Sequence, residues 1–168
     1  MFAFGGDGSR ILDHDVCILN GDLNYRIDTM GRDTVIKAVK TGNLKKLLER
    51  DQLQVAQRRH PTFSLRAFQE SQITFAPTYK YDIESDTYDT SEKRRAPAWC
   101  DRVLYRGGGV VTQIEYRRHE LRNSDHRPVS GRFVIRVKSV QQSKQASIWA
   151  DAEDSFKLVM AELSTESK

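Results

Sequence analysis

Apolar positions along the first third of the chain separate one strand-like run from a helical stretch. Residues 16–19 form a short apolar run that ends at the Asn-Gly-Asp of 20–22. This predicts a buried strand that feeds a loop at its C-terminal end, a frequent place for active-site residues in α/β sheets. Over 33–48 the apolar residues recur at helical spacing, and the Gly-Asn at 42–43 predicts a break between two helices. We expect the helical region to extend over 51–59.

The pattern changes at residue 60. A long Pro-, Thr- and Tyr-containing segment follows, which is typical of an ordered, functional loop. Residues 102–106 and 110–117 read as two strands joined by three glycines, and 131–140 alternates apolar with basic residues, as in a half-buried strand with a cationic face. Apolar residues after position 141 predict a terminal helix. We therefore expect an α/β domain over 1–140 and a helical tail over 141–168.

Composition limits the classes of protein that fit. The chain has 168 residues, with 38% hydrophobic and 30% charged, which suits one polar globular domain. Its net charge of +4 is too small to argue for nucleic-acid binding by itself. The two cysteines, Cys17 and Cys100, do not make a disulfide framework and favour an intracellular protein with reduced thiols. The N-terminus lacks the features of a secretory signal, and no apolar run approaches the roughly 20 residues that span a bilayer.

Cys100 and Arg106 stand at the C-x-x-x-x-x-R spacing used by phosphatases with a cysteine nucleophile. Such sites wrap backbone N–H groups round the phosphate, an approach that glycine commonly permits. The residues between Cys100 and Arg106 contain no glycine, and the adjacent Asp101 would raise the thiol pKa and repel phosphate. We interpret Cys100 as a packing residue.

Three polar sets remain as candidates for chemistry. Asp22 and Asn24 follow the first strand, where a carboxylate can deprotonate water and an amide can donate to an oxyanion, although Asp and Asn are also ordinary turn formers. His126 lies beside Asp125 in a polar loop, a combination in which a carboxylate can orient the imidazole. The third set can bind a multiply phosphorylated ligand or be a solvated charge run, and comprises Tyr79, Lys80, Lys93, Arg94 and Arg95.

Taken together, the stretches GDLNYR, FAPTYKYD, YDTSEKRRAPAWCDRVLYRG and SDHRPV resemble the catalytic domain of the inositol polyphosphate 5-phosphatases, synaptojanin included. The resemblance runs from about residue 16 to 137. The family is related to deoxyribonuclease I and the exonuclease III-type endonucleases. The resemblance implies a four-layer α/β sandwich, in which two sheets are flanked by helices. Because nothing before Asp22 resembles the metal-binding Asn and Glu of the family, we expect this chain to lack the N-terminal half of that domain.

The resemblance also implies roles for individual residues. Asp22 is similar to the residue that activates the attacking water, and Asn24 to a stabiliser of the scissile phosphoryl group. His126 resembles the histidine that binds the reacting phosphate, with Asp101 as the candidate acidic partner, and Asp125 resembles the acidic residue close to the metal. The residues that resemble those gripping the neighbouring phosphate are Tyr79, Lys80, Lys93 and Arg95.

The implied reaction is Mg²⁺-assisted hydrolysis of the 5-phosphate of phosphatidylinositol 4,5-bisphosphate and related inositol phosphates, lipid or soluble. Water then attacks without a covalent enzyme intermediate. We expect a cytoplasmic protein in peripheral contact with membranes and no nucleic-acid partner. Loss of the N-terminal half would impair activity, so a non-catalytic fragment that binds phosphoinositides is the alternative. A nuclease of the same superfamily is less favoured, because the loop at 79–95 resembles the phosphatase version.

Overall fold

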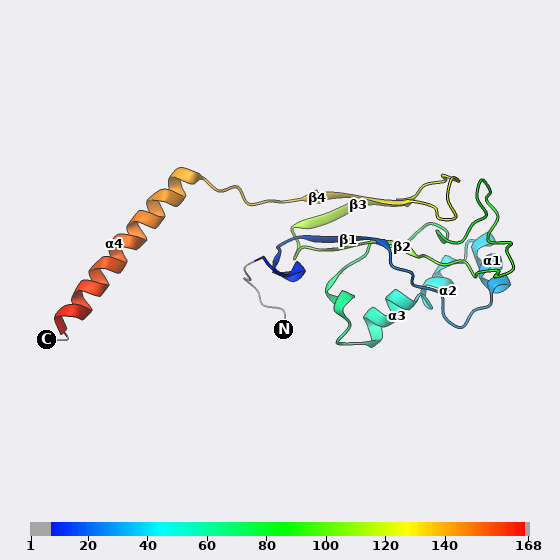
Figure 1. Ribbon diagram of the computed structural model, residues 1–168, viewed down its shortest axis with the longest axis horizontal. Coiled ribbons are helices and arrows are strands. Elements are labelled where there is room, and N and C mark those ends of the chain that lie inside the picture. Colours follow the sequence, from blue (N-terminus) through cyan, green and yellow to red (C-terminus); the bar gives the residue numbers. More distant parts are fainter. Residues whose placement is uncertain (1–7, 167–168) are drawn as a thin grey trace. The chain divides into compact units, whose positions relative to one another are not determined.

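The computed structural model describes residues 8–166, except for the side chains of 162–166. The chain divides into one unit that ends at Ile135 and a second that begins at Arg136 (Figure 1). In chain order the elements are η1 (Ile11–Asp13), β1 (Cys17–Asp22), α1 (Arg32–Lys40), α2 (Leu44–Leu48), α3 (Gln52–Arg59), η2 (Ser64–Ala67), β2 (Asp101–Arg106), β3 (Val111–Arg118), β4 (Val129–Ile135) and α4 (Gln142–Glu166).

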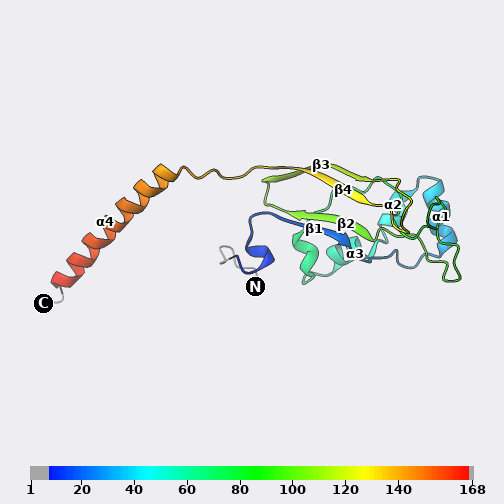
Figure 2. The same cartoon turned by 45° about the horizontal axis from the view of Figure 1, so that its top comes forward.

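The four strands form two antiparallel pairs, and this arrangement agrees with the expected α/β class. β1 pairs with β2, so that Cys17 lies opposite Arg106 and Asp22 lies opposite Asp101. β3 pairs with β4, with a register irregularity between Gln113 and Glu115. Figures 1 and 2 show the two pairs alongside one another, with α3 on the side of β1–β2 away from β3–β4.

Close contacts join the two sheets face to face. The rings of Tyr105 in β2 and Phe133 in β4 meet edge to face, with centroids 5.4 Å apart. A Cβ atom at Gly131 would come within 3.2 Å of Val103 and 2.7 Å of the Gln113 amide, so the absence of a side chain there lets the sheets approach. The strands predicted at 102–106 and 110–117 are thus present, but they belong to different sheets.

Backbone conformation and side-chain capping set the ends of the helices. The predicted break between α1 and α2 is confirmed at Gly42, whose φ of 70° is unfavourable for residues with a side chain. The helical region predicted over 51–59 is a separate helix, because the Asp51 carboxylate accepts a hydrogen bond from the Gln54 N–H at 3.0 Å and caps α3. Two apolar clusters form the core. One includes residues of α1 and α2, and its buried members are Ile27, Val35, Leu47, Ile73 and Trp99. The other joins α3 to β1 and β2, and its buried members are Cys17, Leu53, Phe68 and Leu104.

Two strand predictions need correction. The first strand was expected to be buried, but Cys17 is the one buried residue on β1, and the Ile18 side chain is 44% exposed. In the described residues β3 and β4 contact mainly β2, which leaves this face of β1 open. The strand expected over 131–140 runs from Val129 to Ile135. It ends there because Ile135 pairs with Val111, the first residue of β3, so residues 136–140 have no strand opposite them.

The predicted terminal helix is present as α4, which belongs to the second unit. The side chains of Ile148, Trp149 and Phe156 on it are each at least 65% exposed. None of the helices in the described part of the chain combines the length and apolar character that crossing a membrane requires. The functional division between 1–140 and 141–168 stays a prediction.

A buried ion cluster ties β2 to the helical side of the molecule. The Arg102 guanidinium donates to both Asp51 oxygens, at 3.0 and 2.9 Å, and to both Glu70 oxygens, at 2.8 and 2.6 Å. The Arg102 and Asp51 side chains are 0% exposed, and Glu70 is 6% exposed. Glu70 also accepts a hydrogen bond from the Tyr116 hydroxyl at 2.9 Å, which extends the cluster to β3. Every charged group in the cluster therefore has a partner, as burial demands.

We predict that Arg102→Met lowers the free energy of unfolding by about 3–5 kcal/mol, because it leaves two buried carboxylates without a cation. Urea unfolding followed by circular dichroism measures the change. Arg117→Met is the matched control: its ion pair with Glu115 is 60% and 35% exposed, so we expect a loss below about 1 kcal/mol. Equal losses in the two variants would contradict a structural role for the buried cluster.

Candidate active site

The candidate site is built where β1 ends and the antiparallel β2 begins. Asp22, the last residue of β1, lies opposite Asp101, the first residue of β2. The Leu23 N–H that follows donates to the Cys100 carbonyl at 2.8 Å, which holds the chain in place as it leaves the strand. The two predicted carboxylates, far apart in sequence, are therefore brought together by strand register.

His126 contacts both carboxylates. Its Nδ1 lies 2.9 and 3.1 Å from the two Asp101 oxygens, and its Nε2 lies 3.9 Å from Asp22 Oδ2. Asp101 is itself held by the Thr78 hydroxyl, which donates to its Oδ2 at 2.6 Å. Because Asp101 occupies Nδ1, Nε2 is the ring atom that faces Asp22 and remains open to a ligand. The structure thus places the predicted acidic partner against His126, whereas the catalytic roles stay predictions.

An aromatic and cationic wall borders this group. The Tyr79 ring lies against the His126 imidazole, with centroids 4.5 Å apart, and the Arg26 guanidinium lies 4.7 Å from the centre of the same tyrosine ring. Arg26 also donates to the Asn24 side-chain oxygen. The Asn24 N–H donates to Asp22 Oδ1 at 2.8 Å, in a turn where Asn24 has a φ of 57°. Asn24 therefore forms the turn after β1, and its backbone N–H holds the Asp22 carboxylate.

The predicted phosphate-gripping residues lie on two neighbouring segments. Lys80 follows Tyr79, and its Nζ lies 4.0 Å from the buried Asp89 carboxylate. Asp89 also accepts hydrogen bonds from the N–H groups of Ser91 at 3.1 Å and Arg95 at 2.7 Å. Burial alone would raise the pKa of the Asp89 carboxyl, but the hydrogen bonds from Ser91 and Arg95 outweigh it and hold that pKa below its ordinary value.

The remaining predicted cations are open to solvent. The side chains of Lys93 and Arg95 are exposed, and neither forms an ion pair within residues 8–161. Two unpaired cations on a turn adjoining Lys80 provide a surface that suits phosphate oxygens.

The metal role predicted for Asp125 stays a prediction. Its carboxylate accepts a hydrogen bond from the neighbouring Ser124 hydroxyl at 3.5 Å, and its carbonyl accepts one from the Tyr81 N–H at 2.9 Å. Over the described residues, no three His, Cys, Asp or Glu side chains are grouped so that they could hold a metal ion. The described residues therefore do not by themselves form a cation site, although the exposed Asp22 carboxylate lies 3.9 Å from His126 Nε2.

Cys100 packs in the interior, as the sequence interpretation holds. Its side chain is 0% exposed, and burial raises the pKa of its thiol to about 12, even though the Arg26 charge opposes that rise. Asp22 and Asp101 raise the thiol pKa further. A thiol with this pKa is protonated at neutral pH and is a poor nucleophile.

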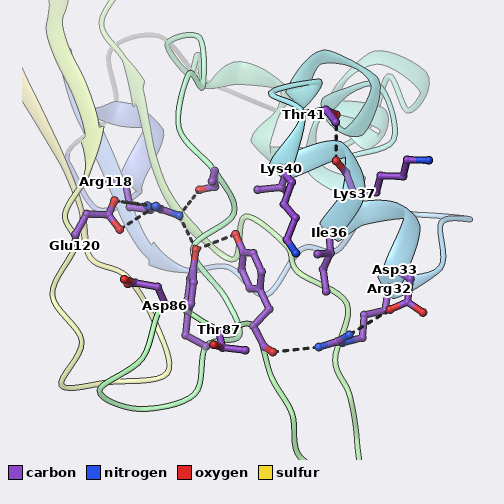
Figure 3. Close-up of a pocket in the computed structure, with 14 residues that line it drawn as sticks. Arg32, Asp33, Ile36, Lys37, Lys40, Thr41, Asp86, Thr87, Arg118 and Glu120 are labelled. Carbon is purple, nitrogen blue, oxygen red and sulfur yellow. Dashed lines mark hydrogen bonds and ion pairs between the residues drawn. The ribbon is translucent and has the colours of Figure 1, made fainter.

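A large cleft lies away from Asp22 and His126. Its volume is about 960 Å³, and α1 forms one wall while the segment around Tyr81 and Tyr88, with Arg118, forms the other (Figure 3). None of the predicted site residues lines it. Contacts and charge, rather than the size of this cleft, identify the candidate site at Asp22 and His126.

Sequence reasoning overlooked three residues that shape the site. Thr78 holds Asp101, Arg26 holds Asn24 and covers Tyr79, and Asp89 joins Lys80 to the turn at 91–95. For Arg26, its place two residues after Asn24 in GDLNYR is a usable signal. Thr78 and Asp89 have no such signal, because their significance depends on partners that only the fold brings near.

A model of the Endonuclease/Exonuclease/phosphatase family 2 matches residues 1–132. The chain belongs to this family. Within the family, curated relatives and a solved structure confirm the predicted resemblance to the inositol polyphosphate 5-phosphatase catalytic domain.

Two curated relatives carry matching names. The chain is 52% identical over 149 residues to a probable inositol polyphosphate 5-phosphatase of Schizosaccharomyces pombe, which covers 88% of this chain and 12% of the relative. It is 46% identical over 152 residues to synaptojanin of Caenorhabditis elegans, covering 89% of this chain and 13% of the relative. The chain thus spans about an eighth of the length of these two family members.

Solved structures confirm the predicted fold class. The inositol polyphosphate 5-phosphatase domain of SPsynaptojanin, in complex with inositol (1,4)-bisphosphate and a calcium ion, matches with a TM-score of 0.74 and 35% identity over 94% of this chain and 46% of that one. A Cimex nitrophorin in its ferrous NO complex matches with a TM-score of 0.65 and 30% identity, over 77% of this chain and 45% of that one. The same fold therefore occurs in proteins with different names, and the site residues must carry the functional inference.

We predict that Cys100 resists thiol reagents in the native protein. In a Cys17→Ala background, its reaction with a disulfide reagent at mildly alkaline pH should be roughly a thousandfold slower than that of a free cysteine, because a pKa of about 12 leaves few thiolates. In concentrated guanidinium chloride the same thiol should react at the ordinary rate. Fast labelling of the folded chain would reinstate Cys100 as a candidate nucleophile.

Proposed function

We propose that this chain serves the Mg²⁺-assisted hydrolysis of the 5-phosphate of phosphatidylinositol 4,5-bisphosphate and related inositol phosphates. The observation that carries the proposal is the pair of contacts around His126, with Asp101 at Nδ1 and Asp22 facing Nε2. The names of the relatives and of the bound inositol (1,4)-bisphosphate in the SPsynaptojanin domain support an inositol phosphate as the substrate. We further propose that the protein acts in the cytoplasm, in peripheral contact with a membrane surface.

The residues of this chain divide the work of such a reaction. Asp101 and Thr78 fix the His126 ring, so that Nε2 is presented to an oxygen of the reacting phosphate. The Asp22 side chain is 48% exposed and can accept a proton from a water that attacks phosphorus. Positioning and charge neutralisation are the main contributions a protein can make to phosphoryl transfer, and these contacts provide the first of them.

A divalent cation is proposed because the SPsynaptojanin domain was solved with calcium. Such a cation supplies charge neutralisation for phosphoryl oxygens when it is bound. Since the described residues do not form a cation site by themselves, we assign no step of the reaction to it. Magnesium keeps several waters and binds through few carboxylates. Asp22, whose side chain is 48% exposed, is a carboxylate that such a hydrated ion can reach.

We predict that Asp22→Asn and His126→Ala each reduce phosphate release from phosphatidylinositol 4,5-bisphosphate by about 10²–10³-fold, because each removes a group that handles protons or phosphate. A colorimetric phosphate assay measures the loss. Asp15→Asn, an exposed carboxylate just before β1, should leave the rate unchanged.

Chelation of divalent cations should abolish release, and Mg²⁺ should restore it. Release that persists under chelation would disprove the cation dependence. A wild-type chain that releases no phosphate with Mg²⁺ present would disprove hydrolysis by this chain.

A non-catalytic phosphoinositide-binding module is the second candidate. It is favoured by one specific contrast: within the described residues no metal cluster is formed, whereas the exposed cationic turn with Lys93 and Arg95 is already ordered by Asp89. Such a module would bind the headgroup without turning it over.

We predict that Lys93→Ala together with Arg95→Ala weakens binding to vesicles containing phosphatidylinositol 4,5-bisphosphate by about tenfold or more, at about 1 kcal/mol for each cation lost. Sedimentation with liposomes measures the binding. Lys45→Ala with Lys46→Ala, two exposed cations on α2, removes the same charge and is the control. If the two double variants bind alike, general charge rather than this turn accounts for membrane binding.

A further inference from the structure

Asp89 is a buried carboxylate to which the motifs above assign no role. Its side chain is 1% exposed, yet it carries an ordered set of contacts. Oδ1 accepts the Ser91 N–H at 3.1 Å, Oδ2 accepts the Arg95 N–H at 2.7 Å, and Lys80 Nζ lies 4.0 Å from Oδ1. A carboxylate removed from water in this way must be held by its partners, and two of the three partners here, Lys80 and Arg95, belong to the predicted phosphate grip.

The backbone of Asp89 reinforces these contacts. Its N–H donates to the Lys80 carbonyl at 2.9 Å, beside an antiparallel bridge between Tyr81 and Tyr88. Lys80 and Asp89 therefore face one another across two adjacent segments. On the other side, the turn at 91–95 wraps round the same carboxylate through its own N–H groups. One side chain thus sets the spacing between the segment with Lys80 and the turn with Lys93 and Arg95.

A helix from outside the loop fixes Asp89 in turn. Arg32, the first residue of α1, donates from one guanidinium nitrogen to the carbonyls of Tyr88 at 3.0 Å and Asp89 at 2.8 Å. Figure 3 shows the Arg32 side chain extending from α1 at the edge of the large cleft. The Arg32 side chain is 17% exposed, so these hydrogen bonds are largely shielded from water. The loop that carries the cations is thereby attached to the helical part of the fold.

We propose that Asp89 is a positioning residue that holds Lys80 and the Lys93–Arg95 turn at the separation needed to grip the phosphate next to the scissile one. This inference rests on the proposed function, since it concerns the same ligand. Cations brought together for a phosphate repel each other before it binds, and a buried anion between them offsets that repulsion. The grip is then arranged in advance, and the ligand does not have to order it.

Asp89→Asn tests the proposal, because asparagine keeps the shape and one acceptor oxygen but removes the charge. We expect the dissociation constant of inositol 1,4-bisphosphate, measured by calorimetry, to rise about tenfold, as expected when one charge-assisted contact is lost. Binding of inositol 1-phosphate, which lacks the neighbouring phosphate, should be little changed. That selectivity distinguishes positioning from a general loss of structure, and thermal unfolding of both proteins checks that the variant is folded.

Asp86→Asn is the matched control. Asp86 lies in the same loop and pairs with Arg122 and Arg127, but it contacts none of the predicted grip residues. Both variants remove one negative charge, so simple electrostatics would tighten binding of an anion in each. Tighter binding by Asp89→Asn would mean that Asp89 only competes with the ligand for Lys80, and would overturn the proposal. Equal affinities of Asp89→Asn and the wild-type chain would also overturn it.

Measurements of ligand binding and of phosphate release test this inference and the proposed function separately. Wild-type binding without phosphate release would disprove hydrolysis and leave the role of Asp89 to be decided by the variant. Where release is measurable, Asp89→Asn should raise KM with little effect on kcat, because the chemistry at His126 is not touched. A wild-type chain that does not bind inositol 1,4-bisphosphate would overturn both.

Discussion

Arg102 and its two buried carboxylates are the interaction on which the rest of the first unit depends. The guanidinium joins β2 to the N-terminal cap of α3 through Asp51, and to β3 through Glu70 and Tyr116. Because successive side chains of a strand point to opposite faces, burying Arg102 turns its neighbour Asp101 the other way, toward His126. A buried charge cluster therefore orients the carboxylate that holds His126.

The consecutive residues Cys100, Asp101 and Arg102 show how one short run serves three purposes. Cys100 fills a buried position, Asp101 belongs to the site, and Arg102 belongs to the ion cluster. The spacing of Cys100 and Arg106 imitates a cysteine phosphatase, but burial keeps the thiol protonated, and Arg106 donates instead to backbone carbonyls before β1. Environment, and not the sequence pattern, decides which side chain of the run can do chemistry.

Proteins that share this fold were solved with different ligands, so the fold alone does not identify a function. The SPsynaptojanin domain and the Cimex nitrophorin both match this chain, although one was solved with an inositol phosphate and the other with NO. What favours the phosphatase interpretation is a set of side chains: His126 between two carboxylates, with a cationic loop adjoining Tyr79. The same fold without those groups would support no such proposal.

The sequence alone determined the strand that ends at Asp22, the helix break at Gly42, the terminal helix and the set of candidate site residues, because periodicity, glycine and short motifs are local signals. Only the tertiary structure decided that β2 and β3 belong to different sheets and that β4 stops at Ile135, where β3 has no residue left to pair. It also decided the parts played by Thr78 and Asp89. Thr78 reaches a carboxylate 23 residues away, and Asp89 is fixed by an arginine 57 residues before it. Contacts over such distances depend on how strands and helices pack, which no local pattern in the sequence records.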